Sequence, residues 1–267
     1  MAVGFPPGSV TRAAMSHQDS YYKNNEAYAA HLAAWNPQLY AKYADTLKPA
    51  TSGARALDVG CGVGQVVARL NEAGFEAHGV DVSQPNLERA AKVCLRCQLY
   101  DGRKLPFPDG HFASAGALNV LEHVDEPEAF IRELVRVVAS GGKIVLSSPN
   151  FFRVFGFRDY HPHMRGVGTK LRNWKRLNQK RAQMRQSPDT VRFDRMTPIV
   201  KEPFTPDDDA IVATNALEME FFLERAGCAV QRVECTDRYV AAPVDFALNL
   251  GPWRYAMFNS FLVAQKQ

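Results

Sequence analysis

The sequence of 267 residues contains no apolar run near the roughly 20 residues that a membrane-spanning helix needs. Its first fifteen residues also lack the apolar core of a secretory signal peptide, and we interpret residues 1–17 as a disordered leader. Internal repeats and low-complexity tracts are absent as well. These absences favour a soluble, cytoplasmic globular protein.

Cysteine is scarce: there are five, an odd number in a chain too long to depend on disulfides. Cys94 and Cys97 form a pair, but no second cysteine pair or histidine cluster lies nearby. We therefore expect buried thiols rather than a zinc or redox site, and the sequence predicts no metal. The net charge of +4 is too small by itself to indicate a nucleic acid partner.

Short strand patterns alternate with helical patterns from residue 55 onward, which implies a parallel sheet with right-handed crossovers. The predicted fold class is α/β, a Rossmann-like, doubly wound, mostly parallel sheet of seven strands. We expect these strands at residues 55–59, 77–80, 97–100, 112–118, 143–148, 229–235 and 255–264.

Two helices of this core have recognisable ends. Asp125 and Glu128 predict a capping box at the start of the helix near residue 130, and the glycines at 141–142 predict its end. Asn215 with Glu218 predicts the start of the helix at 217–226.

The remaining segments lie outside this alternation. Residues 18–50 have a helical pattern interrupted at Pro37 and predict an N-terminal helical cap. The alternation breaks again after the fifth strand, which predicts an insertion at 151–211. The core would then comprise residues 51–150 and 212–267.

The turn after the first strand carries the strongest functional signal, Asp58-Val59-Gly60-Cys61-Gly62-Val63-Gly64-Gln65. Such a glycine-rich turn lets the backbone approach a ligand in front of a helix N-terminus. A dinucleotide site would need its third glycine where Gln65 stands. The acid Asp58 repels a pyrophosphate but suits an ammonium group, so we expect a cationic amino acid–nucleoside rather than NAD.

The second strand ends at Asp81, where a carboxylate can accept hydrogen bonds from both hydroxyls of a ribose. That placement would also suit NAD, and Asp81 could instead cap the following helix. The residue is therefore informative only together with the turn.

Three further motifs follow in order, and with the turn they carry a family resemblance. They are Asp101-Gly102, the run from Leu118 to Val124, and Ser147-Ser148-Pro149-Asn150. From residue 57 to residue 150 the chain resembles the class I S-adenosylmethionine-dependent methyltransferases, particularly their small-molecule branch.

The resemblance implies S-adenosylmethionine as the cofactor and a role for each matching residue. Asp58 would face the amino group of the cofactor, Asp81 the ribose and Asp101 the adenine amino group. The remaining cofactor positions would be Gly60, Gly62 and Gly64 in the turn, Val82 and Gly102 beside the adenine, and Leu118, Asn119 and Val120 along the methionine end.

Methyl transfer needs a base only when the acceptor must lose a proton. His123 is the first candidate because it lies close to the reactive end, although its ring could equally belong to the scaffold. Asp159, His161 and His163 are further candidates. Tyr21 and Tyr22 could close over the sulfonium through their aromatic faces, or they could simply pack.

The insertion contains eight basic residues between His161 and Ser187 and no acid. Leu171, Trp174, Leu177 and Met184 are spaced for one apolar helical face. Such a helix could hold an anionic acceptor, lie on a membrane surface, bind RNA, or be a solvated charged face.

We expect a methyltransferase whose acceptor is small and anionic or linked to a lipid or sugar, bound under the insertion. The alternatives are a methyltransferase of RNA or protein and a non-catalytic adaptor that binds the cofactor. The presence of Asp58, Gly62, Asp81 and Asp101 together favours the enzyme, because an adaptor has no need of all four.

Overall fold

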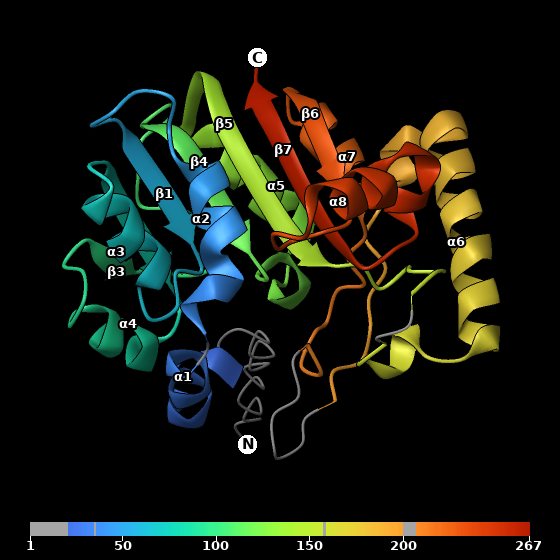
Figure 1. The fold of residues 1–267 in the computed structure, drawn as a ribbon, viewed down its shortest axis with the longest axis horizontal. Coiled ribbons are helices and arrows are strands. Elements are labelled where there is room, and N and C mark those ends of the chain that lie inside the picture. The colour runs from blue at the N-terminus through green and yellow to red at the C-terminus, as the bar shows by residue number, and fades with distance from the viewer. Residues whose placement is uncertain (1–20, 35, 157–158, 200–206) are drawn as a thin grey trace, which may run out of the picture.

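The computed structural model describes residues 21–34, 36–156, 159–199 and 207–267, and the predicted leader lies outside them. One sheet of seven strands organises this part of the chain in the order β3-β2-β1-β4-β5-β7-β6 (Figure 1). Only β7 runs antiparallel to its neighbours β5 and β6. The predicted fold class is therefore confirmed. The strands are β1 (Arg55–Val59), β2 (Glu76–Asp81), β3 (Cys97–Leu99), β4 (Phe112–Leu118), β5 (Val138–Pro149), β6 (Cys228–Glu234) and β7 (Asn259–Lys266).

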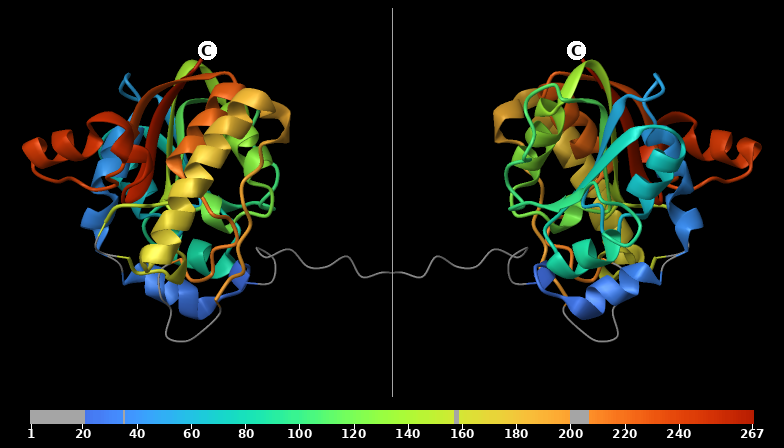
Figure 2. Two further views of the ribbon diagram at one scale, coloured as in Figure 1. Left: turned by 90° about the vertical axis from the view of Figure 1, so that its right-hand side faces the viewer. Right: turned by 90° about the vertical axis from the view of Figure 1, so that its left-hand side faces the viewer.

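Helices cover both faces of the sheet. Helices α2 (Ala41–Leu47) and α3 (Gln65–Glu72) lie on one face, and α5 (Pro127–Arg136) and α7 (Ala216–Arg225) lie on the other (Figures 1 and 2). Because successive side chains of a strand point to opposite faces, adjacent residues of β5 enter different cores. Ile144 joins the apolar cluster with α5, whereas Val145 joins the one with α2 and α3.

The N-terminal segment is broken at Pro37, as predicted. Helix α1 (Glu26–Ala33) begins at Asn25, whose side chain accepts a hydrogen bond from the backbone N–H of Tyr28. A 3₁₀ turn at Pro37–Tyr40 then leads into α2. Helix α1 lies beyond the carboxyl ends of the parallel strands, near α4 (Gln84–Ala90) (Figure 1).

The predicted end of α5 is wrong, whereas the start of α7 is confirmed. Helix α5 begins at Pro127, where the sequence places its start, but its N-cap is Glu126, which makes no side-chain capping hydrogen bond, and Glu128 accepts a hydrogen bond at 3.0 Å from the backbone N–H of Phe193 in the insertion. Helix α5 ends at Arg136, and the glycines at 141–142 lie within β5, which already begins at Val138. In α7, Asn215 accepts from the backbone N–H of Glu218 at 3.0 Å.

The insertion forms one long helix, α6 (Val167–Gln186), at the far edge of the molecule from α1 (Figure 1). Its predicted apolar face is wrong at two positions, because Leu171 and Trp174 are 66% and 49% exposed. The buried face instead carries Asn173, Leu177 and Lys180, since polar partners surround this side of the helix.

The last helix, α8 (Ala242–Asn249), is entirely surface-exposed or half-buried and projects from the face that α2 covers (Figure 2). None of the helices in the described part of the chain is long and apolar enough to cross a membrane.

Candidate active site

A cavity of about 150 Å³ lies at the carboxyl edge of the sheet. Ligands of open α/β sheets bind at this edge. Three parts of the chain form its wall: the segments that follow β1, β2 and β4, the N-terminal segment up to Tyr43, and the end of the insertion at Asp207 and Asp209.

The glycine-rich turn shapes one side of this cavity. Gly60 has a φ of +74°, and a Cβ at this position would lie only 2.3 Å from Val120 Cγ2. Gly64 has a φ of +79°, and its Cβ would lie 3.0 Å from that of Ala90 in α4. Gly60 therefore lets the turn approach Val120 at the cavity wall, whereas Gly64 lets α3 pack against α4.

Asp58 lies at the base of the cavity. Its side chain accepts a hydrogen bond at 2.8 Å from the hydroxyl of Tyr43. Burial raises the pKa of Asp58 to about 7. A bound ammonium group would favour the charged carboxylate and lower that pKa again.

Asp81 serves the protein as well as the cavity. Its Oδ2 accepts from the backbone N–H of Gly62, and its Oδ1 accepts from that of Ser83, both at 2.8 Å. The side-chain amide of Asn86 also donates to Oδ1, at 3.2 Å. Asp81 thus joins the glycine-rich turn to the start of α4, which supports the capping interpretation. Asp81 also lines the cavity, and the ligand interpretation stays a prediction.

Most of the predicted cofactor residues meet at this cavity. Those that line it are Asp58, Gly60, Gly62, Asp81, Val82, Leu118, Asn119 and Val120. Gly64, Asp101 and Gly102 do not line it. Asp101 is exposed, and its Oδ1 accepts from the backbone N–H groups of Arg103 and Lys104. The adenine role of Asp101 therefore stays a prediction.

Two of the predicted catalytic candidates, Tyr22 and His123, also line the cavity. The hydroxyl of Tyr22 lies 2.8 Å from His123 Nδ1 and donates a hydrogen bond to Asp209 Oδ2. All three residues line the cavity. Tyr21 does not, and it packs edge-on against Tyr22 with ring centroids 4.9 Å apart.

The other predicted base candidates lie away from this wall. His161 is fully buried and stacks on His163, with ring centroids 5.3 Å apart. Asp159 pairs with Lys170 of α6 at 2.7 Å. None of the three histidine or aspartate side chains lines the cavity.

Several lining residues were not predicted from the sequence. Four further tyrosines contribute to the wall, and so do the two aspartates of the insertion. The tyrosines are Tyr28, Tyr40, Tyr43 and Tyr100. The three-residue spacing of Tyr40 and Tyr43 could have indicated a shared helical face, whereas nothing near Asp207 or Asp209 in the sequence points to the cavity.

Acidic side chains gather behind His123. Glu122 is fully buried, and burial together with the charge of Asp207 raises its pKa well above the usual range. Burial also raises the pKa of Asp207 to about 7. The hydroxyl of Ser148 donates to Glu122 Oε2 at 2.5 Å. The cavity wall is therefore acidic on this side.

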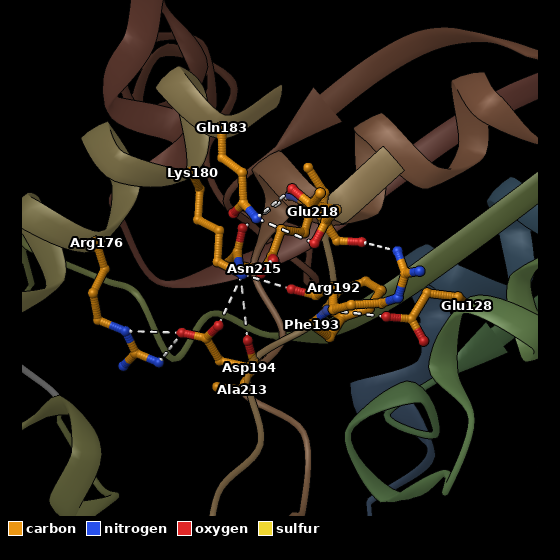
Figure 3. Close-up of polar contacts among 12 residues, drawn as sticks. Glu128, Arg176, Lys180, Gln183, Arg192, Phe193, Asp194, Ala213, Asn215 and Glu218 are labelled. Carbon is orange, nitrogen blue, oxygen red and sulfur yellow. Dashed lines mark hydrogen bonds and ion pairs between the residues drawn. The ribbon is translucent and has the colours of Figure 1, made fainter. Parts of the chain in front are cut away.

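No residue of the basic helix α6 lines the cavity. Cations on the buried side of α6 pair with carboxylates of the fold instead (Figure 3). Lys180 Nζ lies 2.8 Å from Asp194 Oδ1 and 2.6 Å from Glu218 Oε1. Arg176 also pairs with Asp194. Burial works against the charge of Lys180, but Glu218 and Asp194 raise its pKa above the usual value. This network joins α6 to α7.

The cavity can accommodate S-adenosylmethionine by the chemistry of its donors and acceptors. Gln65 Oε1 and Asn86 Oδ1 both belong to residues at the wall, are buried and have no hydrogen-bond partner within the described structure. Hydroxyl and amino donors of a nucleoside would satisfy such acceptors. The carboxylates of Asp58 and Asp81 suit an ammonium group and a ribose, and the tyrosine rings attract a sulfonium.

Comparison with known proteins agrees with this fit. Residues 57–146 match the family model described as a methyltransferase domain. The chain is 33% identical over 114 residues to 2-methyl-6-phytyl-1,4-hydroquinone methyltransferase of Synechocystis, covering 40% of this chain and 34% of that protein. It is 30% identical over 125 residues to demethylmenaquinone methyltransferase of Tropheryma whipplei, covering 45% and 52%.

These matches span a third to about half of each curated relative. A solved S-adenosylmethionine-dependent methyltransferase of Mesorhizobium loti shares the fold, with a TM-score of 0.56 and 17% identity over 85% of this chain and 98% of that one. The strand order, the glycine-rich turn and the family match agree. The chain therefore carries a methyltransferase domain of the class I, S-adenosylmethionine-dependent family.

Proposed function

We propose that this protein transfers a methyl group from S-adenosylmethionine to a small molecule. The observation that carries the proposal is one cavity lined by two sets of residues. The glycine-rich turn with Asp58 and Asp81 forms one set, and Tyr22, His123 and Asp209 form the other. A cofactor and an acceptor could thus meet within the same cavity.

S-adenosylmethionine, when bound, supplies a methyl group on a sulfonium. The protein has to align the acceptor with that group and exclude water, because the thioether is already a good leaving group. Tyr22, Tyr28 and Tyr43 come from the N-terminal segment and line the cavity, and they would exclude water from it.

We assign the removal of an acceptor proton to Tyr22 and Asp209. The hydroxyl of Tyr22 could accept the acceptor's proton while passing its own to the carboxylate of Asp209, with which it is already hydrogen-bonded. His123, predicted from the sequence as the base, would then act as a positioning residue, since its Nδ1 lies 2.8 Å from the same hydroxyl.

The carboxyl groups at the cavity wall affect which class of acceptor can bind. The sequence favours an anionic or lipid- or sugar-linked acceptor. Asp207 and Asp209 would repel an anion at the reacting end, and no cation of α6 lines the cavity. We therefore propose a neutral hydroxyl or amine as the reacting group, and we retain a lipid or sugar as the remainder. A hydroquinone, as in the name of the Synechocystis relative, has such a hydroxyl.

All five cysteines are unpaired, which supports the proposed reducing, cytoplasmic location.

The first test measures binding and turnover together. We expect calorimetry to show binding of S-adenosylmethionine and S-adenosylhomocysteine but not of NAD. With methyl-labelled cofactor, label should enter a small-molecule extract rather than RNA or protein. Comparable affinity for NAD would contradict the cofactor assignment. Binding without transfer to any fraction would instead favour the adaptor.

The second test compares the catalytic effect of Tyr22 with that of the adjacent Tyr21. Tyr22→Phe is expected to lower kcat by about 10²–10⁴-fold, which is the usual contribution of proton transfer, while S-adenosylhomocysteine still binds. Tyr21→Phe is the matched control and should leave kcat nearly unchanged, because Tyr21 does not line the cavity. Equal rates for the two variants would rule out the proton path through Tyr22.

A further inference from the structure

A cluster of possible metal ligands lies at the acidic part of the cavity wall. Its three residues are not among those predicted to bind the cofactor. One ligand atom each from Glu122, His123 and Asp207 can be chosen so that all three lie within 4.8 Å of one another. Two carboxylates and one imidazole are ligand types that divalent transition metals accept. The three residues come from the segment after β4 and from the end of the insertion, so the fold itself brings them together.

Glu122 provides an independent indication that this cluster can bind a ligand. Its side chain is completely buried, and its Oε1 has no hydrogen-bond partner among the described residues. The other oxygen, Oε2, is held by Ser148 at 2.5 Å. A buried carboxylate oxygen without a partner is costly, and native structures rarely leave one unsatisfied. Within the cluster, His123 Nε2 lies 3.8 Å from Oε1.

The surroundings orient the other two side chains. His123 Nδ1 lies 2.8 Å from the hydroxyl of Tyr22 and 3.8 Å from Asp209 Oδ2. These contacts fix the ring with its Nε2 on the side of Glu122, and metal-bound histidines are usually held through their second nitrogen in this way. The hydroxyl of Tyr160 donates to Asp207 Oδ2 at 2.6 Å and fixes that carboxylate.

The carboxyl groups around the cluster also suit a cation, because a bound cation stabilises their ionised forms. Glu122, Asp207 and Asp209 contribute three carboxyl groups within a small volume. Among the described residues, Arg153 is a cation that acts on Asp207. Its guanidinium is already engaged with the carbonyl of Asn150 and lies 3.6 Å from Asp159. A divalent cation would balance the carboxylates far better than this shared charge does.

We propose that Glu122, His123 and Asp207 form a binding site for a divalent metal ion such as Mn²⁺. Glu122 Oε1, His123 Nε2 and a carboxylate oxygen of Asp207 are the ligands. Because His123 and Asp207 also line the cavity, the open coordination positions face the space proposed for the acceptor. There the ion would hold an acceptor oxygen and lower the pKa of its hydroxyl, so that Tyr22 and Asp209 could take the proton. This role rests on the proposed function, whereas the site itself does not.

The test uses the untagged full chain, treated with a chelator and dialysed. Mn²⁺ is then titrated while electron paramagnetic resonance follows the free ion, and calorimetry gives the stoichiometry. We expect one bound Mn²⁺ per chain. Glu122→Gln should weaken the affinity by at least about 10–100-fold. Glu218→Gln, which alters another buried carboxylate outside the cluster, should bind Mn²⁺ as the wild type does.

The outcomes distinguish this proposal from the methyl-transfer proposal. If Glu122→Gln does not fold, Asp207→Asn takes its place, because Asp207 lies at the cavity wall. The metal site is refuted if the wild type binds no Mn²⁺ stoichiometrically. It is also refuted if the folded variant at Glu122 or Asp207 binds Mn²⁺ with unchanged affinity. S-adenosylhomocysteine affinity, measured on the same samples without metal, reports on the proposed function alone.

Discussion

Replacing Lys180 by methionine is expected to lower the free energy of unfolding by about 3–5 kcal/mol at alkaline pH, the usual result of removing one partner of a buried ion pair. Lys180 Nζ lies 2.6 Å from Glu218 Oε1, and the Glu218 side chain is completely buried (Figure 3). Without Lys180, this carboxylate remains in the interior with no cation. Urea denaturation followed by circular dichroism measures the loss.

The loss should also depend on pH. Burial raises the pKa of Glu218 to about 7 in the folded protein, against 4.5 for an ordinary glutamate. Removing Lys180 raises the folded-state pKa further. A carboxyl whose pKa is raised by folding is protonated in both states below the unfolded pKa, and its penalty grows as the pH rises through the folded pKa. The deficit of Lys180→Met should therefore be largest above about pH 8 and small near pH 5.

Two controls test this explanation. Lys175→Met removes an exposed lysine from the same helix and should change stability by less than about 0.5 kcal/mol. The double variant Lys180→Met, Glu218→Gln should recover much of the loss, because it no longer buries an unpaired charge. If Lys175→Met and Lys180→Met were equally stable, the network in Figure 3 would contribute nothing to the fold.

Gly60→Ala is expected to weaken the binding of S-adenosylhomocysteine by on the order of 10–100-fold. A φ of +74° costs a residue with a side chain about 1–2 kcal/mol, and the contact at 2.3 Å with Val120 Cγ2 adds about 1–3 kcal/mol of overpacking. Gly60 and Val120 both line the cavity, so any displacement that relieves the contact alters the cofactor side of the wall. Calorimetry gives the affinity.

Gly53→Ala is the matched control for backbone strain. Gly53 has a φ of +75°, but a Cβ there would have no neighbour within 4 Å. The control should lose a similar amount of stability to the strain alone and should bind S-adenosylhomocysteine normally. A control variant that bound as weakly as Gly60→Ala would show that strain anywhere in the domain, rather than the contact with Val120, controls affinity.

The cofactor side of the site could be predicted because its signals are local. Asp58 lies near the end of β1, and Gly60 and Gly62 follow it within five residues. Asp81 ends the next strand, β2. Parallel strands necessarily bring such ends to one edge of the sheet. The alternation of strands with helices predicted the mostly parallel sheet, without any knowledge of contacts.

The acceptor side was predicted only in part, at Tyr22 and His123, because it depends on contacts between distant segments. Tyr22 and Asp209 are 187 residues apart. The same cause applies near the start of α5, where the carboxylate of Glu128 accepts a hydrogen bond from the backbone N–H of Phe193 in the insertion. It also explains the wrong face of α6. Asn173, which donates to backbone carbonyls of Phe151 and Arg153, is buried there in place of an apolar side chain.

The hydrogen bond between Tyr22 and Asp209 has a consequence for how such a protein can diversify. The family match ends at residue 146, close to the end of β5, and neither of these two residues lies within it. The sheet and its glycine-rich turn can therefore be inherited unchanged while the two flanking segments vary. These segments touch each other across the cavity, so a substitution in one alters the fit of the other. New acceptors should then arise through paired changes in the N-terminal segment and the insertion, and chimeras that exchange only one of them should bind cofactor but lose turnover.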